Sequence, residues 1–309
     1  MPRYPQAILV SCEIPWDQNE QLLEGVFRQE LRHAIEDFDH VYIFGTAGEG
    51  YAVDTVRFHQ IVEIFREETV ECGEEKHLQV GVIGLSTANV VERVKFAYDT
   101  GFRIFQMSLP AWEALNDFEL LTYFKDVCGA FPDARFLHYN LPRARRVLQA
   151  NDYRRLIDAI PNLVATKNTG ADEAATRALL TEASELQHFL GERNFPLGCT
   201  HGECSLLSSW GPLSPEKAKQ FFDAGIHRRE PEVTELQREY SSLLEDVLGP
   251  LMGGESRIDG AYDKMIVRLG GFEEMPLRLL SPYQGFTEEE YQACKRVLHE
   301  RHPDWVPDR

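Results

Sequence analysis

The 309-residue chain lacks two features that would tie it to a membrane, a long apolar run and a secretory leader. No run of 18 apolar residues occurs, and the opening MPRYPQAILVSC holds one arginine and no extended apolar stretch. Cysteine is also scarce, with 6 residues in the whole chain. We therefore expect a cytoplasmic protein with reduced thiols and no membrane-spanning segment.

Basic residues are also few relative to acidic ones. Lys and Arg total 32 against 50 Asp and Glu, so the formal net charge is −18. A surface this acidic repels phosphate backbones and anionic lipids, which argues against nucleic-acid and membrane partners. It also repels a small carboxylate, unless the binding site carries positive charge of its own.

Metal-ligand motifs are missing as well. Cys199, His201 and Cys204 (CTHGEC) lie close in sequence, but their spacing is unlike that of common zinc motifs and no second Cys/His pair accompanies them. We therefore interpret the cysteines as buried or half-buried free thiols and expect no metal site.

What the sequence contains is an alternation of short β-like runs with amphipathic helical ones. The β-like runs are Ala7–Ser11, His40–Gly45, Leu78–Ile83, Arg103–Ser108, Ala134–Tyr139, Leu163–Lys167, Gln187–Leu190 and Cys204–Ser208. Eight such units over roughly 225 residues predict an α/β fold, a (β/α)8 TIM barrel. A doubly wound open sheet is the competing architecture, but it requires a glycine-rich turn where this chain has SCEIPWDQNE.

The helical signals extend beyond the barrel. Apolar residues share one helical face after Asp54, after Ser86 and after Asp117. Past residue 230 only helical patterns follow, and Thr287 with Glu290 forms a capping box. We predict a catalytic barrel over residues 1–230 and a helical C-terminal extension over residues 231–309.

Three reactive side chains come at predicted strand ends, where the active face of such a barrel lies. They are Thr46, Tyr139 and Lys167. A lysine in an apolar barrel mouth loses solvation, so its pKa falls and its neutral amine can attack a carbonyl to form a Schiff base. Each residue also has an ordinary structural interpretation, since strand-end lysines are usually solvated and such tyrosines usually belong to the core. Only the three together favour catalysis.

The chain resembles the dihydrodipicolinate synthase/N-acetylneuraminate lyase superfamily of class I aldolases. Gly45–Glu49 (GTAGE) is similar to the family's G-[ST]-x-G-E loop, and Tyr139–Pro142 (YNLP) to its Y-N-x-P motif. Pro161–Lys167 (PNLVATK) resembles the run that ends in the family's Schiff-base lysine. The resemblance covers about residues 5–228.

The resemblance implies a lyase that acts on pyruvate or another 2-keto acid, as an aldol, retro-aldol or dehydration catalyst without a cofactor. Lys167 would form the imine, Tyr139 would relay protons, and Thr46 would support that relay or hold the substrate carboxylate. Ala47, Gly191 and Leu207 would line the substrate pocket through their backbone. A homo-oligomer, a tetramer or a dimer, is implied as well.

Several positions depart from the family pattern. Ala47 stands where a second hydroxyl is usual, and Trp112 where many relatives lend a tyrosine to a neighbouring subunit. Ala144 replaces an arginine that grips the second substrate in true dihydrodipicolinate synthases, although Arg143 and Arg145 flank it. These two arginines either bind a substrate carboxylate or lie at the surface. We expect a different specificity, with Trp112 pointing to a sugar-derived or aromatic 2-keto acid.

Two alternatives to the lyase remain. One is a non-catalytic relative that binds a small metabolite or a protein partner. The other is a metal-dependent aldolase on the same barrel, for which His138 is the one strand-end histidine that we can place.

Overall fold

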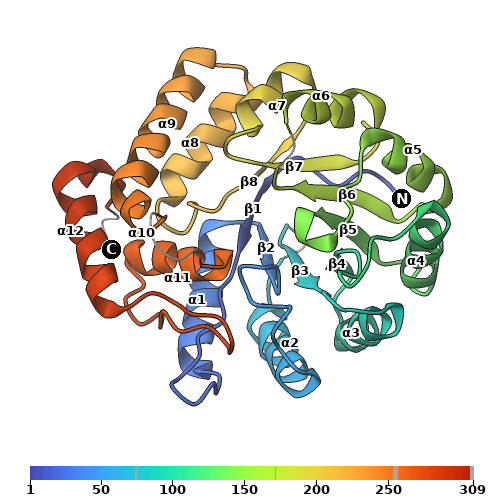
Figure 1. Ribbon diagram of the computed structural model, residues 1–309, viewed down its shortest axis with the longest axis horizontal. Coiled ribbons are helices and arrows are strands. Elements are labelled where there is room, and N and C mark those ends of the chain that lie inside the picture. Colours follow the sequence, from blue (N-terminus) through green and yellow to red (C-terminus); the bar gives the residue numbers. More distant parts are fainter. Residues whose placement is uncertain (74, 171, 253–256, 307–309) are drawn as a thin grey trace.

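Eight parallel strands close into one barrel in this computed structural model, which describes residues 1–73, 75–170, 172–252 and 257–306 (Figure 1). The strands follow chain order and β8 pairs back with β1. Their bounds are β1 Ile8–Ser11, β2 His40–Ile43, β3 His77–Gly81, β4 Ile104–Met107, β5 Arg135–Asn140, β6 Leu163–Asn168, β7 Gln187–Gly191 and β8 Ser205–Leu207. Each lies close to its predicted run, so the predicted TIM barrel is confirmed.

A helix follows each strand and packs on the outside of the barrel. These helices are α1 Glu24–Asp37, α2 Thr55–Thr69, α3 Thr87–Thr100, α4 Asp117–Gly129, α5 Ala150–Ala159, α6 Glu173–Glu182, α7 Phe195–His201 and α8 Pro215–Ile226. The side chains of Asp54, Ser86 and Asn116 accept hydrogen bonds from the first turns of α2, α3 and α4. These caps satisfy helix N–H groups that would otherwise lack partners.

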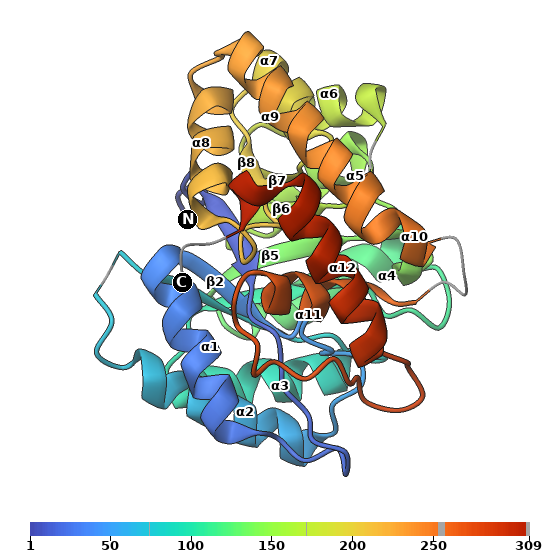
Figure 2. The same cartoon turned by 90° about the vertical axis from the view of Figure 1, so that its left-hand side faces the viewer.

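The C-terminal extension is helical, as predicted. It comprises α9 Glu230–Leu243, a π-helical segment Leu244–Leu248, α10 Gly249–Met252, α11 Asp259–Leu269, α12 Glu288–Arg301 and a short 3-10 turn Pro303–Trp305. The capping box of Thr287 and Glu290 begins α12. Figures 1 and 2 show these helices gathered on one side of the barrel, beyond α1 and α8.

The extension shares its core with the barrel. Leu206 and Trp210 of the barrel belong to the same buried cluster as Leu243, Met265 and Leu298 of the extension. Burying these apolar surfaces together stabilises both parts at once. The predicted domain boundary at residue 230 stays a prediction. In the structure, the parts of the chain before and after residue 230 pack against each other in one core.

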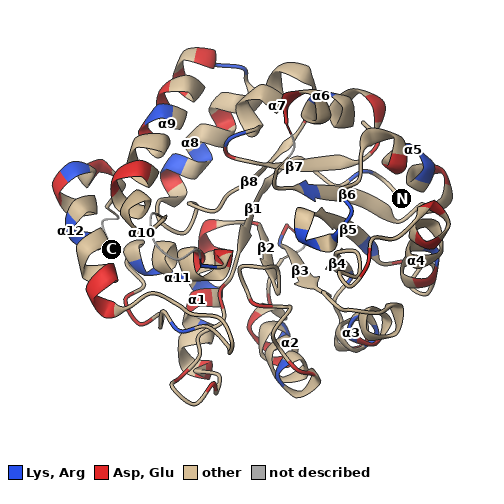
Figure 3. Ribbon diagram, in the orientation of Figure 1, with Lys and Arg blue, Asp and Glu red and all other residues tan. Residues whose placement is uncertain are grey.

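Charged residues concentrate on the outer helices, whereas most of the strand surface is uncharged (Figure 3). Among the described residues, no helix combines the length and apolarity that crossing a bilayer demands. Some charged side chains are instead buried, among them Glu13, Glu49, Lys167 and Lys264 in the barrel and in α11. Because burying a charge is costly unless it is paired or useful, these four direct attention to the barrel mouth.

Glu49 fastens the loop after β2 to the extension. Its carboxylate accepts hydrogen bonds from Lys264 Nζ of α11 at 2.7 Å and from the backbone N–H of Leu280 at 2.7 Å. The indole N–H of Trp16 donates to the same carboxylate at 2.9 Å. Both Glu49 and Lys264 are fully buried. The position of the loop therefore depends on residues more than 200 positions away in the chain.

We expect Lys264→Met to lower the free energy of unfolding by about 3–5 kcal/mol, because it leaves the buried Glu49 carboxylate without its cation. Urea denaturation measures the loss. Arg238→Met, which breaks an exposed ion pair with Glu235, is the matched control and should change stability little. A loss for Lys264→Met no larger than that of the control would contradict this account.

Candidate active site

Lys167 lies near the end of β6 with its side chain buried inside the barrel, 3% exposed. Its Nζ donates a hydrogen bond to the hydroxyl of Tyr42 on β2 at 2.8 Å. No carboxylate of the described residues lies within the 4 Å of an ion pair with this amine. A buried lysine without a bound counter-ion is a costly arrangement, and such sites are candidates for function.

Two phenol rings flank the amine. Nζ lies 4.3 Å from the ring centre of Tyr42 and 4.0 Å from that of Tyr139. Tyr139 sits beside Lys167 because β5 and β6 pair the two residues in register. The Tyr139 hydroxyl is 3.3 Å from Thr46 Oγ1. The structure thus brings the predicted Thr46, Tyr139 and Lys167 together, and their catalytic roles stay predictions.

Burial controls the protonation of this group of side chains. It lowers the pKa of Lys167 from 10.5 to about 7, although the charges of Asp263, Asp259 and Glu13 oppose the shift. Burial also raises the pKa of Tyr139, and it raises the pKa of Tyr42 further above its ordinary value. Near neutral pH the amine is therefore partly neutral, while both phenols keep their protons.

Sequence reasoning missed three residues near the amine. Nothing in the sequence marked Tyr42 as a site residue, because a tyrosine within an apolar run is usually part of the hydrophobic core. Glu13 did give one, since it ends the apolar run of the first strand just as Lys167 ends that of the sixth. Its carboxyl is fully buried, and burial raises its pKa to about 7. Asp263 comes from α11, which no local pattern connects to Lys167.

The loop after β2 turns sharply to present Thr46. β2 ends at Ile43, earlier than predicted, because Phe44 adopts a positive φ of 63°. A Cβ at Gly50 would lie 2.3 Å from the Phe44 carbonyl oxygen, so this close approach requires glycine. Among the described residues, the backbone N–H groups of Thr46 and Ala47 have no recorded partner. Free N–H groups of this kind can bind a carboxylate.

A cavity of about 580 Å³ opens beside this loop at the mouth of the barrel. Thr46, Leu141, Arg143 and Ala144 are among its lining residues. Tyr139 and Lys167 are not among its described lining residues, but Thr46 is, and its hydroxyl lies 3.3 Å from that of Tyr139. The volume is typical of sites that bind small organic molecules.

The other predicted pocket residues are more scattered. Gly191 and Leu207 pair with each other at the ends of β7 and β8, and neither lines this cavity. A Cβ at Gly191 would meet no atom within 4 Å, so that position faces open space. Arg145 is exposed and does not line the cavity either. Trp112, from which we infer a changed specificity, is 83% exposed and is not among the described lining residues of the cavity.

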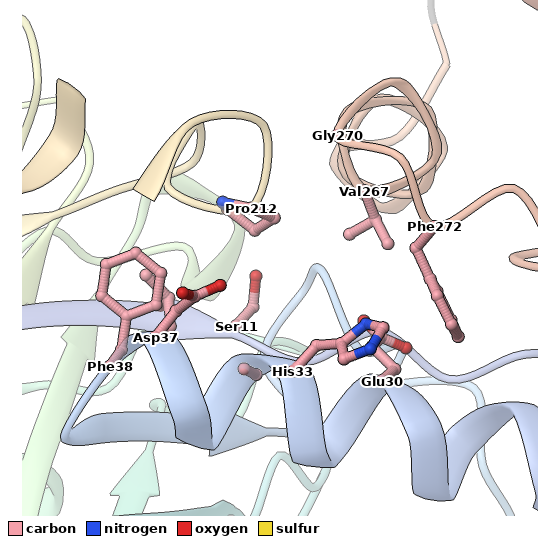
Figure 4. A pocket seen from close by; sticks show the side chains of 11 residues that line it. Ser11, Glu30, His33, Asp37, Phe38, Pro212, Val267, Gly270 and Phe272 are labelled. Carbon is pink, nitrogen blue, oxygen red and sulfur yellow. The ribbon is translucent and has the colours of Figure 1, made fainter. Parts of the chain in front are cut away.

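A second cavity lies behind β1, between α1 and the end of α11 (Figure 4). It measures about 30 Å³ and includes Glu30 and His33 in its lining. This volume is that of about one water molecule, so it does not admit a keto acid. The cavity at the barrel mouth is therefore the candidate substrate site.

The residues considered for metal binding lie elsewhere. His138 faces outward from β5, and its Nδ1 lies 2.8 Å from the hydroxyl of Tyr153 on α5. Cys199 and Cys204 are free, with their sulfur atoms 3.7 Å apart. Within the described part of the chain, no group of three or more His, Cys, Asp or Glu side chains is arranged to hold a metal ion.

Comparison with known proteins gives one family and one fold. The profile of the Dihydrodipicolinate synthetase family matches residues 5–300. CdNal from Clostridium difficile, solved with mannosamine, superposes with a TM-score of 0.81 at 20% identity and covers 96% of this chain and 98% of that one. Dihydrodipicolinate synthase from Aquifex aeolicus gives 0.83 at 15% identity, covering 99% and 100%. YagE from E. coli, solved with pyruvate, gives 0.81 at 14% identity, covering 96% and 98%.

The low pKa of Lys167 makes the stability of the protein depend on pH. The folded state, with a pKa of about 7, binds fewer protons than the unfolded state, near 10.5, so stability rises as pH rises between these values. From pH 7 to pH 9 we expect the wild type to gain about 2–3 kcal/mol relative to Lys167→Met. Urea unfolding of both proteins at both pH values measures this.

Lys95→Met, which removes an exposed lysine, is the control and should follow the wild type at both pH values. An identical pH dependence for the wild type and Lys167→Met would mean that the amine is not desolvated.

Proposed function

The chain belongs to the dihydrodipicolinate synthetase family, and we propose that it is a lyase of the aldolase type that acts on pyruvate or another 2-keto acid. The reaction would run through a Schiff base on Lys167, in an aldol, retro-aldol or dehydration direction. The observation that carries the proposal is the Lys167 amine, which is buried, free of a carboxylate contact and flanked by two phenols.

The proposed chemistry begins with attack of the neutral amine on the keto carbon. Tyr139 then donates a proton to the departing hydroxyl, so that water leaves and an imine forms. Thr46 holds the Tyr139 hydroxyl in place and can pass protons to it. The protonated imine withdraws electrons from the neighbouring carbon, which stabilises the enamine that makes or breaks the next bond.

The loop after β2 suits the carboxylate of a keto acid. The free N–H groups of Thr46 and Ala47, with the Thr46 hydroxyl, supply neutral donors close to the amine. Ala47 offers its N–H but no hydroxyl, so this chain binds the carboxylate with one donor fewer than the usual family loop.

A non-catalytic binding protein is the alternative. Ala47 and Ala144 favour it, because both lack the polar groups that the family pattern has there. The buried amine disfavours it, since a binder gains nothing from the cost of desolvating a lysine. In either case we expect a homo-oligomer, with the exposed Trp112 and Phe118 as candidates for a subunit contact.

Borohydride reduction in the presence of pyruvate should add a carboxyethyl group to Lys167, because reduction fixes an imine as a stable amine. Peptide mass spectrometry locates the added group. Lys264, another buried lysine but one that is ion-paired, is the internal control and should stay unmodified. If Lys167 stays unlabelled under conditions that label a known class I aldolase, the proposed lyase function is contradicted and the non-catalytic binding protein is favoured.

Tyr139→Phe should slow the reductive trapping of pyruvate on Lys167 by roughly 10²–10⁴-fold, because the variant loses the proton donor for imine formation and keeps the amine. Tyr42→Phe removes the hydroxyl that accepts a hydrogen bond from the amine but leaves the Thr46–Tyr139 contact in place, so it should slow trapping much less. Equal losses in the two variants would mean that Tyr139 has no special part in proton transfer.

A further inference from the structure

We propose that the substrate carries an uncharged, largely apolar group beyond its reacting keto carbon, and that this group occupies the cavity at the barrel mouth. This inference rests on the proposed function, because the imine on Lys167 anchors the other end of the molecule. The cavity, at about 580 Å³, is much larger than pyruvate requires. It falls within the range of about 300–1,000 Å³ that encloses larger organic ligands.

The walls of the cavity are mainly aliphatic and aromatic. Ile83, Leu109 and Leu141 follow β3, β4 and β5 and contribute branched side chains from three sides. Tyr51 and Tyr283 add two rings, packed edge to face with centres 5.0 Å apart. Contact with such walls favours an aromatic or branched aliphatic group, because it removes apolar surface from water on both partners.

Arg143, one of the two cations in the described lining of the cavity, is already neutralised. Arg143 lines the cavity, but its guanidinium donates two hydrogen bonds to the carboxylate of Asp259, at 2.8 and 2.9 Å. This fork geometry is the strongest that a guanidinium forms with a carboxylate. Asp259 balances the charge of Arg143, so the guanidinium N–H groups that remain offer a substrate carboxylate hydrogen bonds but no unbalanced positive charge.

Arg93, the other cation of the lining, is directed at the backbone. Its Nη1 donates to the carbonyl oxygens of Gly50 and Ile83 at 2.7 and 2.6 Å, and its Nη2 donates to that of Val53 at 2.7 Å. The guanidinium therefore holds the loops after β2 and β3 and is not aimed into the cavity.

The remaining charged residues of the lining, Asp54 and Glu92, are acidic. No lysine or arginine of the described lining is thus free to neutralise a second anionic group, and the whole chain carries a net charge of −18. A carboxylate or phosphate in this cavity would lose its hydration without gaining a partner, which disfavours binding.

One polar feature points to a single neutral acceptor on the ligand. The Tyr51 hydroxyl is buried at the cavity wall and has no hydrogen-bond partner in the described residues. Buried hydroxyls are normally paired, so a hydroxyl, ether or carbonyl oxygen of the ligand would complete this one. Ser108 and Asn89 also line the cavity with uncharged groups.

Reductive trapping with two keto acids of equal carbon number tests the proposal without requiring a known reaction direction. 2-Oxopentanoate ends in a methyl group and 2-oxoglutarate in a carboxylate. We expect the rate of trapping on Lys167 to be at least about tenfold higher for 2-oxopentanoate. Equal rates, or faster trapping of 2-oxoglutarate, would overturn the proposal.

A pair of variants separates charge from size. Ala144 lines the cavity, so Ala144→Arg places an unpaired cation there, whereas Ala144→Met adds similar bulk without charge. Ala144→Arg should shift the trapping ratio toward 2-oxoglutarate by about tenfold, and Ala144→Met should leave the ratio unchanged while slowing both acids. An equal change of the trapping ratio in both variants would overturn the proposal, because the charge of residue 144 would then not determine which keto acid is preferred.

The failure of this inference is distinguishable from the failure of the proposed function. If pyruvate itself is not trapped on Lys167, the imine is absent and both fall together. If pyruvate is trapped and the wild type prefers 2-oxoglutarate, the imine stands and the uncharged substrate class is wrong.

Discussion

The burial of one amine, with no carboxylate of the described residues in contact with it, is the constraint on which the site depends. Lys167 is held between the rings of Tyr42 and Tyr139, which offer a hydroxyl and two aromatic faces in place of a full counter-charge. Asp263 and Glu13 act on its charge from a greater distance and only partly offset the cost of burial. The barrel supplies this environment because its strand ends converge and exclude water, so a lysine there is both costly to charge and ready to react.

The C-terminal extension completes the active face. Lys264 and Leu280 hold the Glu49 carboxylate, so they fix the loop that carries the neutral donors. Ile258 and Tyr283 line the cavity itself. The extension therefore forms part of the wall of the candidate substrate site, and it shares a buried core with the barrel.

The same fold supports many chemistries, so the side chains around the amine decide what this member does. Ala47 and Ala144 remove polar groups from the mouth, and Asp259 neutralises Arg143. Tyr51 leaves one hydroxyl available. In the proposed reaction, these features leave a keto acid anchored at Lys167 and withdraw recognition from a second anionic group.

The sequence by itself determined the barrel, its strand order and three residues of the site. Alternating apolar periods specify the fold locally, and Thr46, Tyr139 and Lys167 stand out because each polar residue ends an apolar strand. The tertiary structure alone decided the partners of these residues. Tyr42 contacts Lys167, which is 125 positions away in the sequence, and Lys264 contacts the carboxylate of Glu49, which is 215 positions away. Such contacts follow from the closure and register of the barrel, which no local sequence pattern encodes.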